Sequence, residues 1–191
     1  MNRRSLIKTV AAGVFASGMF AGTTASAETT TLRLHQFLPP VATVPKHILK
    51  PWGERVEAAS NGSLKIEHFD GMALGGRPPE LMDQAIDGVV DMSMTVVGYT
   101  PGRYPKTEVF ELPFMMTDPV ATSKAFWQLV EDDLQAGEYK DLKVLGAWVH
   151  GPGVIHTKEP VTKLEDLAGK KLRGPTRVIC PSSGFLEPKA A

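Results

Sequence analysis

Arg173 is the side chain whose type and place along the chain best suit the capture of a small anion. It ends a predicted strand at residues 171–173 and precedes Gly174 and Pro175. Ligands of open parallel sheets bind where strands pass into loops. A guanidinium at such a point can hold a carboxylate through two parallel hydrogen bonds. An ordinary surface arginine is the alternative, and spacing alone leaves both interpretations open.

Four further side chains adjoin other predicted strand-end loops. Phe37, Tyr99 and Trp148 could stack on a ligand there, and packing in the core accounts for them equally well. His150 begins a loop rich in Gly and Pro, and we count it as a fourth candidate contact. Together with Arg173, these residues make up the predicted substrate site.

The sequence also permits a second kind of site at two histidines. His150 and His156 flank Gly151-Pro152-Gly153 and could approach a common point, as in an exported metal-dependent hydrolase. No nearby carboxylate or cysteine completes a metal-ligand set. Two histidines with separate partners are therefore the simpler interpretation, and we expect no metal site.

Motifs of the common catalytic and cofactor sites do not occur in the sequence. There is no G-x-S-x-G, H-E-x-x-H, P-loop or G-x-G-x-x-G pattern. The single cysteine, Cys180, allows neither an internal disulfide nor a thiolate metal cluster. We therefore expect neither an enzyme nor a bound cofactor.

The first 27 residues are typical of a cleaved secretory signal. Arg3 and Arg4 precede an apolar run, and Ala25-Ser26-Ala27 supplies an A-x-A cleavage site. The arginine pair fits a twin-arginine signal, although the general secretion route accepts the same start. Without Arg3, Arg4 and Lys8, the chain keeps 18 Lys and Arg against 21 Asp and Glu, a balance that disfavours nucleic acid as a partner.

Alternating and helical hydrophobic patterns follow one another along the rest of the chain. Alternation predicts strands at residues 31–35, 64–69, 89–95, 142–149, 154–157 and 171–173. Helical spacing predicts helices at residues 44–59, 80–87, 119–135 and 163–168. This order is typical of an α/β protein with an open, mainly parallel sheet covered on both faces.

Short motifs in a fixed order resemble a known family. They are Leu34–Pro39, Leu74-Gly75-Gly76 with Pro79-Glu80-Leu81, Gly88–Met92, Tyr99–Pro105, Glu108–Phe114 and Leu164–Arg173. The set is similar to the solute-binding subunits of TRAP (tripartite ATP-independent periplasmic) transporters, of the DctP type. The resemblance covers roughly residues 32–178.

This resemblance implies a periplasmic-binding-protein-like fold of two α/β lobes that enclose a small organic acid in the periplasm. The family passes its ligand to a TRAP membrane permease, and its K-[LIM]-R element, which ends here at Arg173, clamps the substrate carboxylate. We expect a first lobe at residues 28–150 and a crossing segment with the start of the second lobe at residues 151–178.

The last residues depart from the family pattern. Residues 179–191 show no periodicity and match the family nowhere, so we expect an aberrant tail and a second lobe that is largely missing. The sequence thus predicts a TRAP receptor for a carboxylate whose binding is impaired by truncation. A truncated product without function of its own is the alternative, ahead of the hydrolase.

Overall fold

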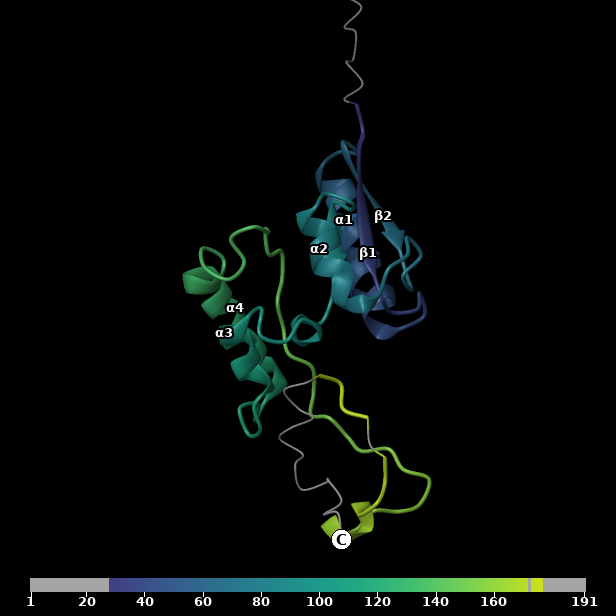
Figure 1. The fold of residues 1–191 in the computed structure, drawn as a ribbon. Coiled ribbons are helices and arrows are strands. Elements are labelled where there is room, and N and C mark those ends of the chain that lie inside the picture. The colour runs from purple at the N-terminus through teal and green to yellow at the C-terminus, as the bar shows by residue number, and fades with distance from the viewer. Residues whose placement is uncertain (1–27, 172, 177–191) are drawn as a thin grey trace, which may run out of the picture.

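The computed structural model describes residues 28–171 and 173–176, and the structural statements below concern those residues. The predicted leader (residues 1–27) and the predicted tail (residues 179–191) lie outside them. The described chain forms a three-stranded parallel sheet of β1 (Thr30–Gln36), β2 (Leu64–Phe69) and β3 (Met92–Met94), in the order β2-β1-β3 (Figure 1). In the central strand, Leu34 lies opposite both His68 and Met92. The first three predicted strands are confirmed, although the third is shorter than expected.

One continuous helical run covers the sheet. A π-helical turn, Pro45–Leu49, leads directly into α1 (Lys50–Ala59), as the spacing at residues 44–59 predicts. Pro51 lacks the N–H that a regular α-helix would need at this point, and the widened turn lies directly before it. Leu34, Leu49 and Ile66 form the core between this run and the sheet.

The remaining helices are short, apart from α4. Their bounds are Pro78–Glu80 (a 3-10 turn), α2 (Leu81–Ile86), Val97–Tyr99 (3-10), α3 (Pro105–Glu108), Val109–Glu111 (3-10), α4 (Pro119–Leu129), Val130–Leu134 (π) and Leu164–Leu167 (3-10). Asp118 caps α4, because its Oδ1 accepts a hydrogen bond from the Ala121 N–H at 2.6 Å. None of the helices in the described part of the chain has the length and apolar character needed to cross a bilayer.

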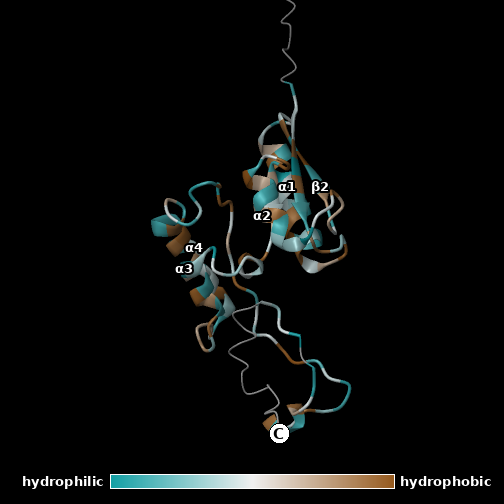
Figure 2. Ribbon diagram, viewed as in Figure 1, coloured by the Kyte–Doolittle hydropathy of each residue, from teal (hydrophilic) through white to brown (hydrophobic). Residues whose placement is uncertain are grey.

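A second core lies away from the sheet, where α3 and α4 lie side by side (Figure 1). Its buried members are Met82, Tyr104, Phe126, Val130, Leu134 and Tyr139. Apolar and polar residues alternate around both α1 and α4, which gives each helix one side suited to a core (Figure 2). The described chain is therefore built on two small cores instead of one.

The strands predicted at residues 142–149 and 154–157 are wrong, since these described residues form no strand, and the strand predicted at residues 171–173 lies partly outside the described residues. The segment 142–149 is irregular, and side chains bond to its backbone where a neighbouring strand would. The Gln135 side chain accepts from Val144 N–H (2.9 Å) and donates to Leu142 C=O (2.7 Å). The Ser123 hydroxyl accepts from Val149 N–H at 3.0 Å. Side chains at positions 123 and 135 thus satisfy three backbone groups of this segment in place of a neighbouring strand.

Candidate functional site

An aromatic pair lies at the carboxyl end of the central strand. Phe37 directly follows β1, and Tyr99 ends the 3-10 turn Val97–Tyr99. Their ring centroids are 5.5 Å apart at an interplanar angle of 70°, an edge-to-face contact. Both rings are half-buried, so each keeps surface for a further partner. The structure thus joins two of the five residues that the sequence predicts.

Gln36 fixes the backbone next to Phe37. Its side chain is fully buried; Nε2 donates to Leu38 C=O (2.7 Å) and to Asp70 Oδ1 (2.8 Å), and Oε1 accepts from Leu38 N–H (2.5 Å). Asp70 is also paired with Lys50 at 3.2 Å. Phe37 is therefore held by a buried polar network that reaches β2 and α1.

On the opposite face of β1, His35 fixes the backbone of a second loop. Its buried ring contacts Gln84 Oε1 through Nδ1 (2.7 Å), and its Nε2 accepts from Leu74 N–H (3.3 Å). A donor at Nδ1 and an acceptor at Nε2 require one neutral tautomer. This arrangement ties the loop after β2 to α2.

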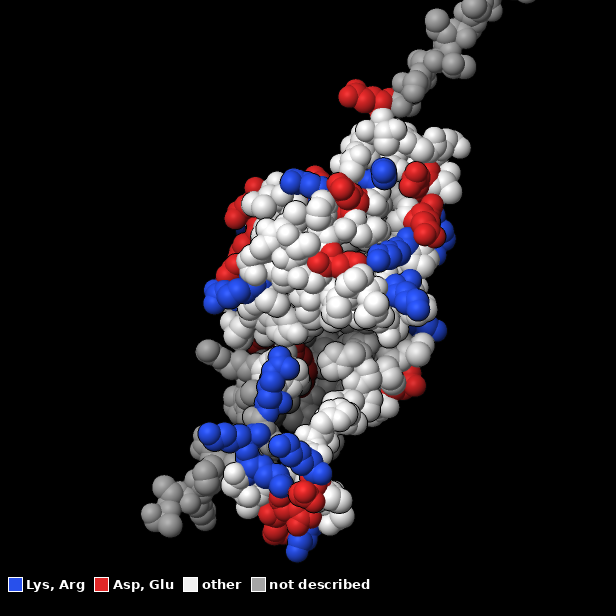
Figure 3. Space-filling view, turned by 90° about the vertical axis from the view of Figure 1, so that its right-hand side faces the viewer, with Lys and Arg blue, Asp and Glu red and all other residues white. Residues whose placement is uncertain are grey.

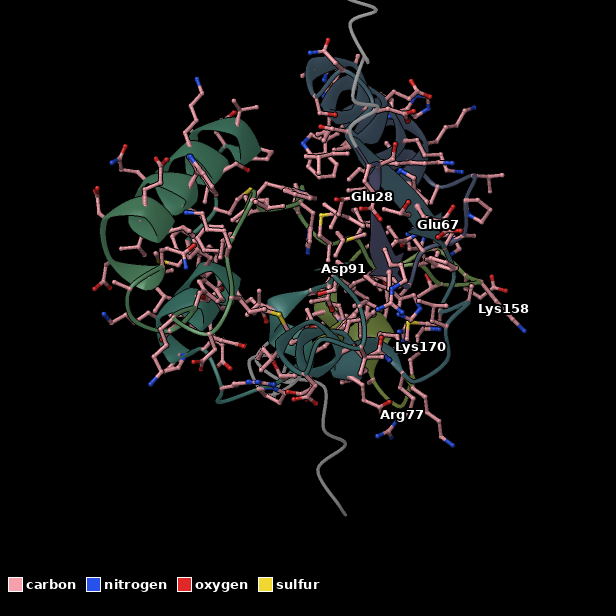
Figure 4. The ribbon with its side chains drawn as sticks, turned by 90° about the horizontal axis from the view of Figure 1, so that it is seen from above. Glu28, Glu67, Arg77, Asp91, Lys158 and Lys170 are labelled. Carbon is pink, nitrogen blue, oxygen red and sulfur yellow. The ribbon has the colours of Figure 1, made fainter. Side chains whose placement is uncertain are left out.

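Arg77 continues the same loop on its outer side, where it points away from the molecule (Figure 4). Its Nε donates to Glu80 Oε1 at 2.7 Å. Hydrogen bonds from the Arg77 side chain and backbone lower the pKa of the exposed Glu80 carboxyl. This cation is therefore already paired with a carboxylate at the surface.

The other three predicted contacts lie in the later, irregular part of the chain. Arg173 is exposed and forms no ion pair with any described carboxylate. Trp148 is 42% exposed, beside Val149, which Ser123 anchors to α4. His150 is exposed, and its Nδ1 lies 2.6 Å from Gly151 O. Among the described residues, no hydrogen bond or aromatic contact joins these three to the Phe37–Tyr99 pair.

Sequence reasoning missed a contact that connects these two parts. The Thr176 hydroxyl donates to Glu111 Oε2 at 2.5 Å, and Thr176 is only 7% exposed. The Glu111 carboxylate lies so close to Gly98 that a methyl group on that glycine would overlap it. Glu111 lies within the family motif Glu108–Phe114, so the motif was visible in the sequence, whereas the role of this residue was not.

Positive charge is concentrated in the segment of the chain that contains Arg173. Residues 151–176 carry five exposed cations, namely Lys158, Lys163, Lys170, Lys171 and Arg173. Figure 3 shows Lys and Arg collected over the lower part of the molecule, with acidic residues among them. A local excess of positive charge favours the approach of an anion.

Two other features fall outside this arrangement. A hollow of about 630 Å³ runs along α4 and is lined by Val120, Trp127 and Val149 among others, but by none of the five predicted contacts. In the part of the chain that the structure describes, no three His, Cys, Asp or Glu side chains are grouped so as to hold a metal ion. His150 and His156 thus have no third ligand there.

Comparison with known proteins extends this picture. The family model for bacterial extracellular solute-binding proteins of family 7 (DctP) matches residues 36–180. A marine metagenome TRAP solute-binding protein specific for aromatic acids, solved with 3-hydroxybenzoate, is 49% identical (TM-score 0.78; 83% of this chain and 50% of that chain covered). A TRAP solute-binding protein from Rhodoferax ferrireducens, solved with benzoate, is 45% identical (TM-score 0.79; 84% and 50%).

A third solved structure is more distant. It is a TRAP solute-binding protein from Bordetella bronchiseptica with bound mandelate, 32% identical (TM-score 0.64; 73% of this chain and 44% of that chain). The chain spans about half the length of the curated relatives it matches. The predicted α/β fold of periplasmic-binding-protein type is confirmed over that half, whereas the predicted lobe boundary near residue 150 stays a prediction.

Proposed function

Because this chain belongs to the bacterial extracellular solute-binding proteins of family 7, we propose that it receives a small organic acid in the periplasm for import by a TRAP membrane permease. The secretory signal in the sequence supports that compartment. The family is one of binding receptors and not of enzymes, so the proposed event is reversible, non-covalent capture.

The proposed ligand is an aromatic carboxylate. Solved neighbours at 49% and 45% identity hold 3-hydroxybenzoate and benzoate. Such a molecule has a flat apolar ring and one negative charge, so its receptor needs an aromatic surface and a cation. The Phe37–Tyr99 pair is the observation that carries the proposal, because it places that surface at the carboxyl end of β1.

Each predicted contact then has a role. Phe37 and Tyr99 pack on the ligand ring, Arg173 holds the carboxylate through its fork of N–H donors, and Trp148 and His150 border the ligand. Since the chain spans half the length of its neighbours, we assign to these residues one wall of the binding site. We therefore expect weak binding by the 191-residue chain on its own.

Saturation-transfer NMR detects weak binding and tests this assignment. Benzoate should give a saturable signal from its ring protons, and benzyl alcohol, which keeps the ring without the charge, should give much less. Arg173→Ala should reduce the benzoate affinity about tenfold or more, as loss of a charged hydrogen-bond donor does. Lys170→Ala, which removes another exposed cation of the same segment, should change it little. Equal signals from both compounds, or equal effects of both substitutions, would refute the proposal.

A further inference from the structure

We infer that Glu111 is a positioning residue, which ties the segment carrying Arg173 to the loop carrying Tyr99. Its importance for ligand capture rests on the function proposed above. The tie itself is a property of the chain, and it can be measured without any ligand.

The first half of the tie is the bond to Thr176. A neutral hydroxyl donates to a carboxylate at 2.5 Å, the short distance typical of a charge-assisted hydrogen bond. Its two residues are 65 positions apart in the sequence. It is the only hydrogen bond that residues 171 and 173–176 make with other described residues, and these five residues lie outside every helix and strand. Glu111 therefore supplies the polar anchor of this segment.

The second half of the tie is the contact with Gly98. The Glu111 carboxylate fills the space that a side chain at position 98 would occupy. Tyr99 is the next residue in the chain and pairs with Phe37. One carboxylate thus touches the backbone of the aromatic loop and also holds the last described residue.

The reach of the chain links this tie to Arg173. Three residues span at most about 11 Å, so the Arg173 backbone must lie within that distance of Thr176. The segment returns to the middle of the molecule at this point (Figure 1). Arg173 itself is exposed and has no described carboxylate partner, so the tie places its backbone and leaves its guanidinium available.

Limited trypsin digestion of the 191-residue chain tests the tie. Trypsin cleaves after Arg173 and also after Lys158, an exposed residue 18 positions before Thr176 that serves as an internal control. Thr176→Val removes the hydroxyl at nearly constant size, and we expect cleavage after Arg173 to become about tenfold faster. Thr176→Ser keeps the hydroxyl and should restore the native rate. Cleavage after Lys158 should not change.

A double substitution tests whether the two single changes act through the same hydrogen bond. Glu111→Ala should have the effect of Thr176→Val, and the two together should cleave no faster than either alone, because they remove the same bond. An unchanged rate after Arg173, or equal acceleration after Lys158, would overturn the inference. Benzoate binding by Thr176→Val and Thr176→Ser is compared afterwards by NMR. If the native chain gives no benzoate signal, the proposed function fails, whereas the cleavage rates still decide on the tie.

Discussion

The segment Thr30–Gln36 and the segment at residues 142–149 start from similar sequence patterns and end in different structures. In both, apolar residues are spaced two positions apart, at Leu32 and Leu34 in the first segment and at Leu142 and Val144 in the second. The first is paired on both sides, by β2 and by β3, and becomes the central strand of the sheet. The second forms no ladder among the described residues, although Leu142, Val144, Ala147 and Val149 still face the second core. Apolar side chains can therefore face a core without a ladder, and the availability of a neighbouring strand decides whether a sheet forms.

The largest expected effect comes from shortening a core side chain of the paired segment. Leu34 is 4% exposed and packs against Leu49 and Ile66. Leu34→Ala should lower the free energy of unfolding by about 2–4 kcal/mol through lost burial and a cavity. Leu145→Ala, at a residue 61% exposed in the unpaired segment, should stay within about 0.5 kcal/mol of the native chain. Urea denaturation followed by circular dichroism measures both, and equal losses would contradict the distinction drawn between the two segments.

A smaller effect is expected where side chains replace a strand. Gln135→Ala removes the amide that bonds to Leu142 and Val144, and it should cost about 1 kcal/mol. The change should be local, with faster hydrogen exchange at the Val144 amide and unchanged exchange in β1. Gln128→Ala is the matched control, since its amide contacts only the Asp132 carboxylate one turn away on the surface. A native exchange rate at the Val144 amide in Gln135→Ala would show that the Gln135 hydrogen bonds do not hold the segment.

The smallest expected effect is a dependence of the unfolding free energy on pH, which arises from His68 in β2. Burial is the main cause that lowers the pKa of His68 from 6.5, and the nearby Lys50 lowers it further, while Asp70 and Glu54 act in the opposite direction. Its Nδ1 is buried with no hydrogen-bond partner among the described residues. A folded-state pKa below the unfolded value means that the unfolded chain binds the proton more readily. Stability from this group is therefore present above about pH 6.5 and declines as the pH falls below it.

His68→Gln should make the unfolding free energy depend less on pH between 7.5 and 5.5. The measurement is a series of urea titrations across that range. His47→Gln, at an exposed histidine before α1, should keep the native slope. A native slope in His68→Gln as well would assign the pH dependence to other groups.

Sequence patterns predicted the first half of the fold well and the later half poorly. The helical spacing at residues 44–59 and the cap at Asp118 depend on neighbours close in sequence, and the strand at residues 64–69 pairs with the strand that precedes it in the chain; all three are confirmed. The wrong strands at residues 142–149 and 154–157 depend on partners far along the chain, which no local pattern reveals.

The predicted site shows a similar contrast between residues that the sequence identifies and residues that it does not. Phe37 and Tyr99 were identified because loops follow the predicted strands, and the structure brings the two rings together. The residues that hold them were missed, since Gln36 and His35 resemble ordinary polar residues at the end of a strand. Their importance arises from Asp70 and Gln84, which approach only after folding. The roles of Arg173, Trp148 and His150 stay predictions.

Glycine at position 98 limits how this protein can be redesigned. A side chain there would have to displace the Glu111 carboxylate, so position 98 is best varied together with position 111. Mutant libraries that aim at altered ligand preference near Tyr99 should therefore randomise positions 98 and 111 jointly, because screening them singly would discard every compensated combination.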